Sequence, residues 1–216
     1  MHLFRVFVTS LLLALSTNAV QALSYRVTRL DNGRCSRKND CATVFVATGE
    51  IGRDELQSFR EFVGSLNQRA AGPRAFVIDS AGGNLAGAFA MGLVLRRIGI
   101  PVIVGSVQDG KLAPGFCGSA CVFVLMGGRT RQVAPGSVVA VHAPQEVPAR
   151  GEHGGEELSL ADAAHRQQIT NILTGYARRN GVDPALITLT MSVPPDDRRP
   201  LTPAELRQFR LVVVAK

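Results

Sequence analysis

Residues 115–128 read GFCGSACVFVLMGG and contain Ser119, the candidate reactive side chain around which the other motifs are arranged. Small residues surround Ser119 and an apolar run follows it, which indicates a turn leading into a short helix. Backbone N–H groups at such a junction point outward and favour negative charge. A serine with open access on a rigid support is a candidate nucleophile; the alternative is a serine that only caps the helix.

A second stretch, residues 135–144, reads PGSVVAVHAP. Its apolar run predicts a strand over residues 138–142, which delivers His142 to a sheet edge. The spacing from Ser119 allows this strand to return beside the serine. Because a serine hydroxyl needs a base to take its proton, we expect His142 to be that base.

A glycine turn, DSAGGN at residues 79–84, follows a predicted strand and precedes a predicted helix. Its spacing matches neither the phosphate loop nor the dinucleotide fingerprint. Backbone at Gly82 and Gly83 can approach a substrate carbonyl closely. One of these amides, together with the amide of Ala120, is therefore the candidate oxyanion hole.

Strands and helices alternate along the chain. Apolar, β-branched runs predict strands at 42–48, 75–79 and 102–105, and periodic apolar residues predict helices after residue 52 and over 85–98. This alternation predicts a single α/β domain with parallel strands.

The C-terminal third predicts more helix. One helix ends near Asn180, and its inward residues are expected to be Ile169, Ile172, Leu173 and Tyr176. The pattern at Thr202, Pro203 and Glu205 predicts a capping box that starts another helix. We also expect a polar loop over 144–157, a helix cap at Ser159 and a closing strand at 211–215.

The N-terminus has one cationic residue, Arg5, then an apolar run and a small-residue exit near Ala22. This order predicts a secretory signal peptide at 1–22, cleaved to leave one domain at 23–216. The apolar run is too short for a comfortable membrane span, so we expect no stable span after cleavage; an uncleaved anchor is the alternative. The protein is thus expected to be periplasmic or secreted.

The chain is basic, with a formal net charge of +7, and its composition is that of a globular protein. The basic residues are scattered along the sequence, and the chain has two Tyr and no Trp. A nucleic-acid surface needs cations gathered on one face with aromatics between them. The sequence therefore predicts a solvated basic surface and no nucleic-acid partner.

The four cysteines form two close pairs. In an oxidising compartment such pairs suggest disulfides, Cys35 with Cys41 across a polar loop and Cys117 with Cys121 around Ser119. Zinc is a weaker alternative, because no histidine lies at metal-ligand spacing from either pair. We expect no metal and no cofactor.

Taken together, the three motifs resemble the proteolytic subunit of Clp protease within the Clp/crotonase superfamily. The similarity includes the glycine turn at 79–83, the serine helix with Gly127-Gly128 and Arg131, and the histidine strand at 135–144. It implies repeated β-β-α units whose parallel strands form a spiral core. The signal peptide and the Cys-x-Ser-x-Cys pattern look more like a secreted bacterial branch than the cytosolic subunit.

By this resemblance Ser119 is the nucleophile and His142 the general base. The third member is Asp197 or Asp196, which lie slightly early relative to the family's aspartate; the alternative is a polar turn with surface acids. The family's membrane-bound relatives use a Ser–Lys dyad, but the only nearby lysine, Lys111, lies in a loop.

The function expected is that of an ATP-independent periplasmic serine peptidase, which acts on peptides or unfolded protein through an acyl-enzyme. No ATPase partner is expected, and a homo-oligomer is compatible with the family resemblance. The alternative from another class is a non-catalytic binding or assembly module that kept the fold. A third interpretation, an acyl-transfer or crotonase-like enzyme, is less favoured because coenzyme A is not expected outside the cytosol.

Overall fold

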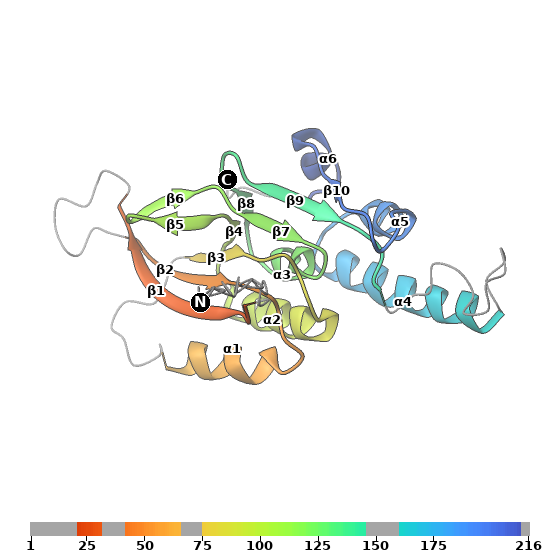
Figure 1. The fold of residues 1–216 in the computed structure, drawn as a ribbon, viewed down its shortest axis with the longest axis horizontal. Helices are drawn as coiled ribbons and strands as arrows, with labels where there is room; N and C mark the ends of the chain where they lie inside the picture. The colour runs from red at the N-terminus through yellow and green to blue at the C-terminus, as the bar shows by residue number, and fades with distance from the viewer. Residues whose placement is uncertain (1–20, 32–41, 66–74, 146–159, 213–216) are drawn as a thin grey trace, which may run out of the picture.

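The computed structural model describes residues 21–31, 42–65, 75–145 and 160–212 (Figure 1). Its main sheet has the order β1-β2-β3-β4-β8, in which β1 runs antiparallel to β2 and the other neighbours are parallel. The strands are β1 (Ser24–Leu30), β2 (Ala42–Thr48), β3 (Ala75–Asp79), β4 (Val102–Val104) and β8 (Arg131–Val133). The predicted strands at 42–48 and 75–79 are confirmed, and the parallel core follows from them.

Side chains alternate between the two faces of this sheet, as the pleat of a strand requires. Val44, Val46 and Val77 form a small cluster on one face, with Val107 from the hairpin of β5 (Ser106–Gln108) and β6 (Lys111–Ala113). The alternate residues of the same strands belong to the large core on the other face.

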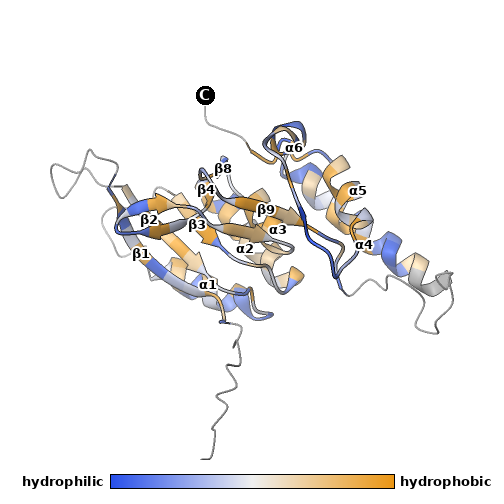
Figure 2. Ribbon diagram, turned by 45° about the horizontal axis from the view of Figure 1, so that its top comes forward, coloured by the Kyte–Doolittle hydropathy of each residue, from blue (hydrophilic) through white to orange (hydrophobic). Residues whose placement is uncertain are grey.

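Helices cover that large core. They are α1 (Glu55–Gly64), α2 (Leu85–Ile98) and α3 (Cys121–Met126), followed by α4 (Leu160–Arg179), α5 (Ala185–Ser192) and α6 (Pro203–Gln208). Figure 2 shows that hydrophobic residues dominate the central strands β2, β3 and β4. The predicted helix at 85–98 is confirmed, with the Asn84 side chain accepting the amide of Gly87 at its start and Gly99 in the left-handed conformation at its end.

A second sheet stands beside the main one, in the order β10-β9-β7. It contains β7 (Phe116–Gly118), β9 (Val138–Val141) and β10 (Arg199–Pro200), with β7 parallel to β9 and β10 antiparallel to it. A bridge between Ser80 and Cys117 joins this sheet to the end of β3. The three motifs of the sequence therefore meet where the two sheets touch.

Several expectations for the C-terminal third are confirmed and one, the inward position of Ile172, is wrong. The capping box is present, with Thr202 Oγ1 accepting from the Glu205 amide and the Glu205 carboxylate accepting from the Thr202 amide. Ile172, expected to face inward, is 50% exposed, because α4 is covered on only one side by α2, α3 and α5 and turns Leu173 and Tyr176 into the core. Leu211 and Val212 form no strand; Leu211 instead packs in the core after α6.

The remaining expectations fall largely outside the described residues. These are the signal segment up to residue 20, the Cys35–Cys41 pair, most of the 144–157 loop, the Ser159 cap and the end of the closing strand. Within the part of the chain that the structure describes, no helix is both long and apolar enough to span a bilayer.

Candidate active site

Ser119 lies in the tight turn between β7 and α3, and its backbone is in the left-handed region at φ +53°. A non-glycine residue held in such a conformation costs roughly 1–3 kcal/mol, which the surrounding structure must offset. Ser119 donates its amide to the carbonyl of Ala140 at 3.0 Å and accepts the amide of Val122 at 3.1 Å. The serine is partly exposed while its neighbours are buried. Strain at an accessible serine between strand and helix is typical of a nucleophile.

Asp79 and Ser80, at the end of β3, hold the strand that leads to the serine. The amide of Phe116 donates to Asp79 Oδ1 at 2.8 Å, and the amide of Ser80 donates to the Phe116 carbonyl at 2.8 Å. The amide of Gly118 then donates to the Ser80 carbonyl at 3.0 Å. These three hydrogen bonds fix the glycine turn and the serine turn relative to each other.

Gly82 packs directly on the serine, with φ at +112°. A Cβ atom at this position would lie 2.8 Å from Ser119 Cβ, 3.1 Å from the Ala120 amide nitrogen and 2.7 Å from the Gly118 carbonyl oxygen. Both the backbone conformation and the lack of space require glycine.

Of the three candidate oxyanion donors, two are available. Gly82 donates its amide to Ser80 Oγ at 3.2 Å. Gly83 forms a parallel bridge with Ile51, in which Ile51 donates to the Gly82 carbonyl and accepts from the Asn84 amide, both at 2.8 Å. In this pattern the amide of Gly83 points away from Ile51. Among the described residues neither the Gly83 nor the Ala120 amide has an acceptor.

His142 follows β9 directly and is 9% exposed. Its Nδ1 lies 2.8 Å from the carbonyl oxygen of Ala143. A carbonyl can only accept, so this contact assigns the proton of the neutral imidazole to Nδ1 and leaves Nε2 unprotonated. The amide of Ala143 donates to the Val193 carbonyl at 2.9 Å, which anchors the backbone beside the ring. This tautomer is the one a general base needs.

Ser119 and His142 line one cavity of about 920 Å³, together with Gly82, Gly83 and Ala120. Asp196 also lines it, whereas Asp197 does not. Both aspartates are exposed, and in the described residues neither carboxylate is hydrogen-bonded to His142. The structure thus brings together the serine, the histidine and the amides, and places Asp196 on the wall. Lys111 is in β6 and is not part of this wall.

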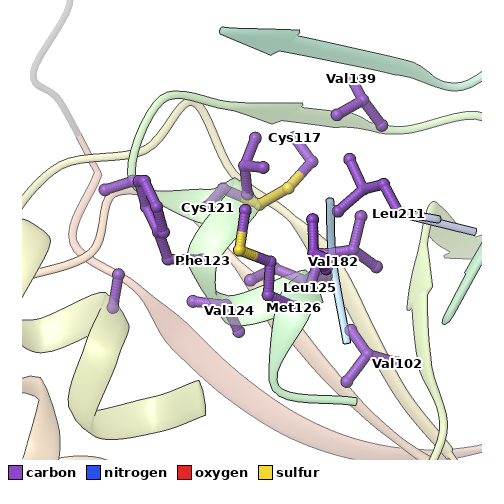
Figure 3. Close-up of a cluster of buried hydrophobic side chains, with 14 of the residues drawn as sticks. Val102, Cys117, Cys121, Phe123, Val124, Leu125, Met126, Val139, Val182 and Leu211 are labelled. Carbon is purple, nitrogen blue, oxygen red and sulfur yellow. A yellow bond between two sulfur atoms is a disulfide. The ribbon is translucent and has the colours of Figure 1, made fainter. Parts of the chain in front are cut away.

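Cys117 and Cys121 form a disulfide across the serine turn, with Cα atoms 5.3 Å apart. Figure 3 shows the bridge inside the hydrophobic core, among Phe123, Val139 and Leu211. Both cysteines are fully buried. The described residues contain no cluster of His, Cys, Asp and Glu suited to a metal ion.

A buried carboxylate behind the glycine turn escaped the sequence analysis. Glu55, 6% exposed, accepts the Tyr25 hydroxyl at 2.5 Å and the Gly52 amide at 3.0 Å. Burial, reinforced by Glu55, raises the pKa of the Tyr25 phenol strongly. This network holds the segment on which Gly83 is supported. The available signal was the i, i+4 spacing of Glu55 and Phe59, which puts the carboxylate on the buried helix face.

No protein-family model and no curated protein matches the chain. Solved structures do match. A serine-to-alanine mutant of the 1510-N membrane-bound stomatin-specific protease aligns with a TM-score of 0.54 and 17% identity over 77% of this chain and 75% of that one. A lysine-to-alanine mutant of the same protease, in complex with a substrate peptide, aligns with a TM-score of 0.53 and 18% identity over 77% of this chain and 71% of that one. ClpP1 from Listeria monocytogenes aligns with a TM-score of 0.48 and 15% identity over 76% of this chain and 84% of that one.

The two alignments with the stomatin-specific protease establish the fold. The chain has the Clp/crotonase-like α/β fold that the sequence predicts, the fold of Clp-like proteases. At such identities the chemistry has to be argued from the residues of this chain.

Proposed function

We propose that this protein is a serine peptidase that hydrolyses peptide bonds through an acyl-enzyme on Ser119. The observation that carries the proposal is the strained serine turn opening into a cavity shared with a histidine whose free nitrogen is Nε2. A left-handed backbone is costly for a non-glycine residue. Asp109 and Arg210 adopt it as well, but of these three residues only Ser119 lines the cavity.

The chemistry follows from the atoms available. His142 Nε2 takes the hydroxyl proton as Ser119 Oγ attacks the substrate carbonyl carbon. The carbonyl oxygen becomes an oxyanion, and the amides of Gly83 and Ala120 are the donors proposed to stabilise it. The imidazolium then gives its proton to the leaving amine, and an acyl-serine remains. Water, deprotonated by the same nitrogen, hydrolyses this ester and regenerates the hydroxyl.

The orienting group of His142 is the least conventional part of the proposal. The Ala143 carbonyl already holds Nδ1–H, so a serine–histidine pair can act with a backbone acceptor in place of an acid. Asp196 is the better placed of the two sequence candidates for adding negative charge, because it lies on the cavity wall and Asp197 does not.

The proposed setting is outside the cytosol, without ATP and without an unfoldase, on peptides or unfolded chains. The N-terminal sequence supports export, and the buried disulfide suits an oxidising compartment. Assembly into a homo-oligomer belongs to the same proposal.

One observation favours the alternative, a binding or assembly module that kept the fold: neither aspartate contacts His142 among the described residues. In such a module the cavity would hold a peptide without cleaving it. Reactivity of Ser119 distinguishes the two functions.

The test is labelling of the oxidised mature protein with a fluorophosphonate, read as intact mass. We expect one label, lost in Ser119→Ala and kept in Ser192→Ala, whose serine is exposed on α5. His142→Gln should label at least about 100-fold more slowly, because general-base assistance contributes 10²–10⁴-fold. A folded protein that takes no label would favour the binding module.

A further inference from the structure

The C-terminal ends of helices from distant parts of the chain converge around Arg131. Arg131 is 3% exposed, and among the described residues its guanidinium donates only to backbone carbonyls. These carbonyls belong to Met126 at the end of α3 and Gly128 after it, Asn180 after α4, and Arg210 and Leu211 after α6. The end of α2 is close as well, because the amide of Arg129 donates to the Ile100 carbonyl at 3.1 Å.

Exposed arginines occupy the same helix ends. They are Arg96 and Arg97 on α2, Arg129 after α3, Arg178 and Arg179 on α4, and Arg207 and Arg210 at α6. Burial lowers the pKa of Arg131, and Arg96 and Arg210 lie near enough to lower it further. Burial raises the pKa of Tyr176, and Arg179 and Arg96 lie near enough to oppose that rise. The sequence predicted scattered cations, and the fold instead brings these arginines to helix ends that converge on Arg131, which we call the arginine face.

Acidic residues do little to balance this face. Near the C-terminal ends of these helices the acids in the described residues are Asp183, which accepts the Ala185 amide, and Glu205, which is paired with Arg199. Each helix C-terminus carries about half a negative charge. Four such ends offset about two positive charges. The seven exposed arginines outnumber that, so the face keeps a net positive charge.

The arginine face also carries apolar side chains. Ile98, between the arginines of α2 and its Gly99 cap, is 40% exposed, and Ile100 and Val212 are partly exposed. Neither tyrosine is available for stacking on this face, because Tyr176 is only 2% exposed and Tyr25 packs against Phe59 and Phe62. Cations with exposed aliphatic groups and no stacking aromatics suit a lipid surface better than a nucleic acid.

We propose that the arginine face docks the protein peripherally on a membrane leaflet rich in anionic phospholipid headgroups. Clusters of several cations are attracted to the negative surface potential of anionic leaflets, and each cation adds to the binding free energy without a contact to one particular lipid. This inference does not depend on the peptidase activity.

The orientation that docking imposes would leave the cavity open. The cavity lies at the N-terminal ends of α2 and α3, where Asn84, Leu85, Ser119 and Ala120 line it. The arginine face lies at the C-terminal ends of the same helices. Along α2, which has 14 residues and rises about 1.5 Å per residue, the two ends are roughly 20 Å apart; along the six-residue α3 they are about 9 Å apart.

The experiment is co-sedimentation of the mature protein with phosphatidylglycerol–phosphatidylcholine vesicles and with pure phosphatidylcholine vesicles, at low salt. Binding is expected only to the anionic vesicles. It should fall steeply at 1 M salt, where the Debye length is about 3 Å. The double substitution Arg178→Glu with Arg179→Glu should weaken the partition coefficient by roughly 30-fold.

The matched control is Arg60→Glu with Lys111→Glu, which changes the net charge equally at exposed sites on α1 and β6. It should lose much less binding than the arginine-face variant, and melting curves should show both variants folded. Equal losses in the two variants, equal binding to pure phosphatidylcholine, or displacement by 10 mM free inorganic phosphate would each overturn the proposal. Binding of a short DNA duplex in preference to anionic vesicles would overturn it too.

Discussion

Removing the Cys117–Cys121 bridge tests whether the serine turn depends on its covalent closure. The bridge joins residues four apart around Ser119, and both sulfurs are buried in the core. Closing so short a loop restrains the unfolded chain by about 2 kcal/mol. We expect the double variant Cys117→Ala with Cys121→Ala to lose about that much unfolding free energy.

The same restraint bears on the left-handed conformation of Ser119. If the whole of this roughly 2 kcal/mol restrains the serine turn, loss of the bridge lowers the fraction of molecules with the left-handed turn by up to roughly 30-fold, since 1.36 kcal/mol is a factor of ten. The rate of fluorophosphonate labelling should fall by 10- to 30-fold, with KM for a peptide substrate nearly unchanged. Because the sulfurs are buried, substitution is a cleaner perturbation than reductant.

Val124→Ala is the matched control. Val124 lies in α3, the helix that begins at Cys121, and is fully buried. Its truncation should therefore destabilise the fold by on the order of 2 kcal/mol without opening the serine turn. Chemical denaturation gives the stability of each variant and intact-mass labelling gives the rate. A cysteine variant that labels as fast as Val124→Ala would refute the idea that the disulfide positions the serine.

Further predictions concern the acids and the glycine turn. Asp196→Asn and Asp197→Asn should each reduce kcat by less than tenfold, whereas loss of an orienting triad acid costs about 10⁴-fold; a drop of that size in either variant would identify the acid. Gly82→Ala should nearly abolish labelling, because its Cβ would lie 2.8 Å from Ser119 Cβ, while Gly64→Ala, with open space around it, should label normally and melt no lower. The hydrogen bond from Arg199, helped by Thr202, lowers the pKa of Glu205 from 4.5 to about 2. A carboxylate with a lowered folded pKa stabilises above its unfolded pKa and loses this effect as pH falls through the folded value. The melting temperature of the wild type should therefore exceed that of Glu205→Gln at neutral pH, and the gap should close between about pH 4.5 and 2; a constant gap would contradict the assignment.

Local patterns were sufficient for the central elements. The strands at 42–48 and 75–79, the helix at 85–98 and the capping box at Thr202 could be predicted because residue periodicity and capping chemistry act within a few residues. The short strands β7, β8 and β10 could not. Unlike the three-residue β4, which is an unbroken β-branched run, they contain glycine, proline or charged residues and form only by pairing with distant strands.

For the candidate site, residue patterns were enough to select groups that line one cavity: the serine among small residues, the histidine after an apolar strand and the glycine turn. Which backbone amides lack an acceptor depends on long-range contacts, because the Ser80 side chain accepts the Gly82 amide and pairing with Ile51 turns the Gly83 amide outward. The contact between His142 Nδ1 and a backbone carbonyl also arises only on folding. The arginine face arises in the same way, since residues far apart in sequence are brought together when packing against one core aligns the ends of their helices.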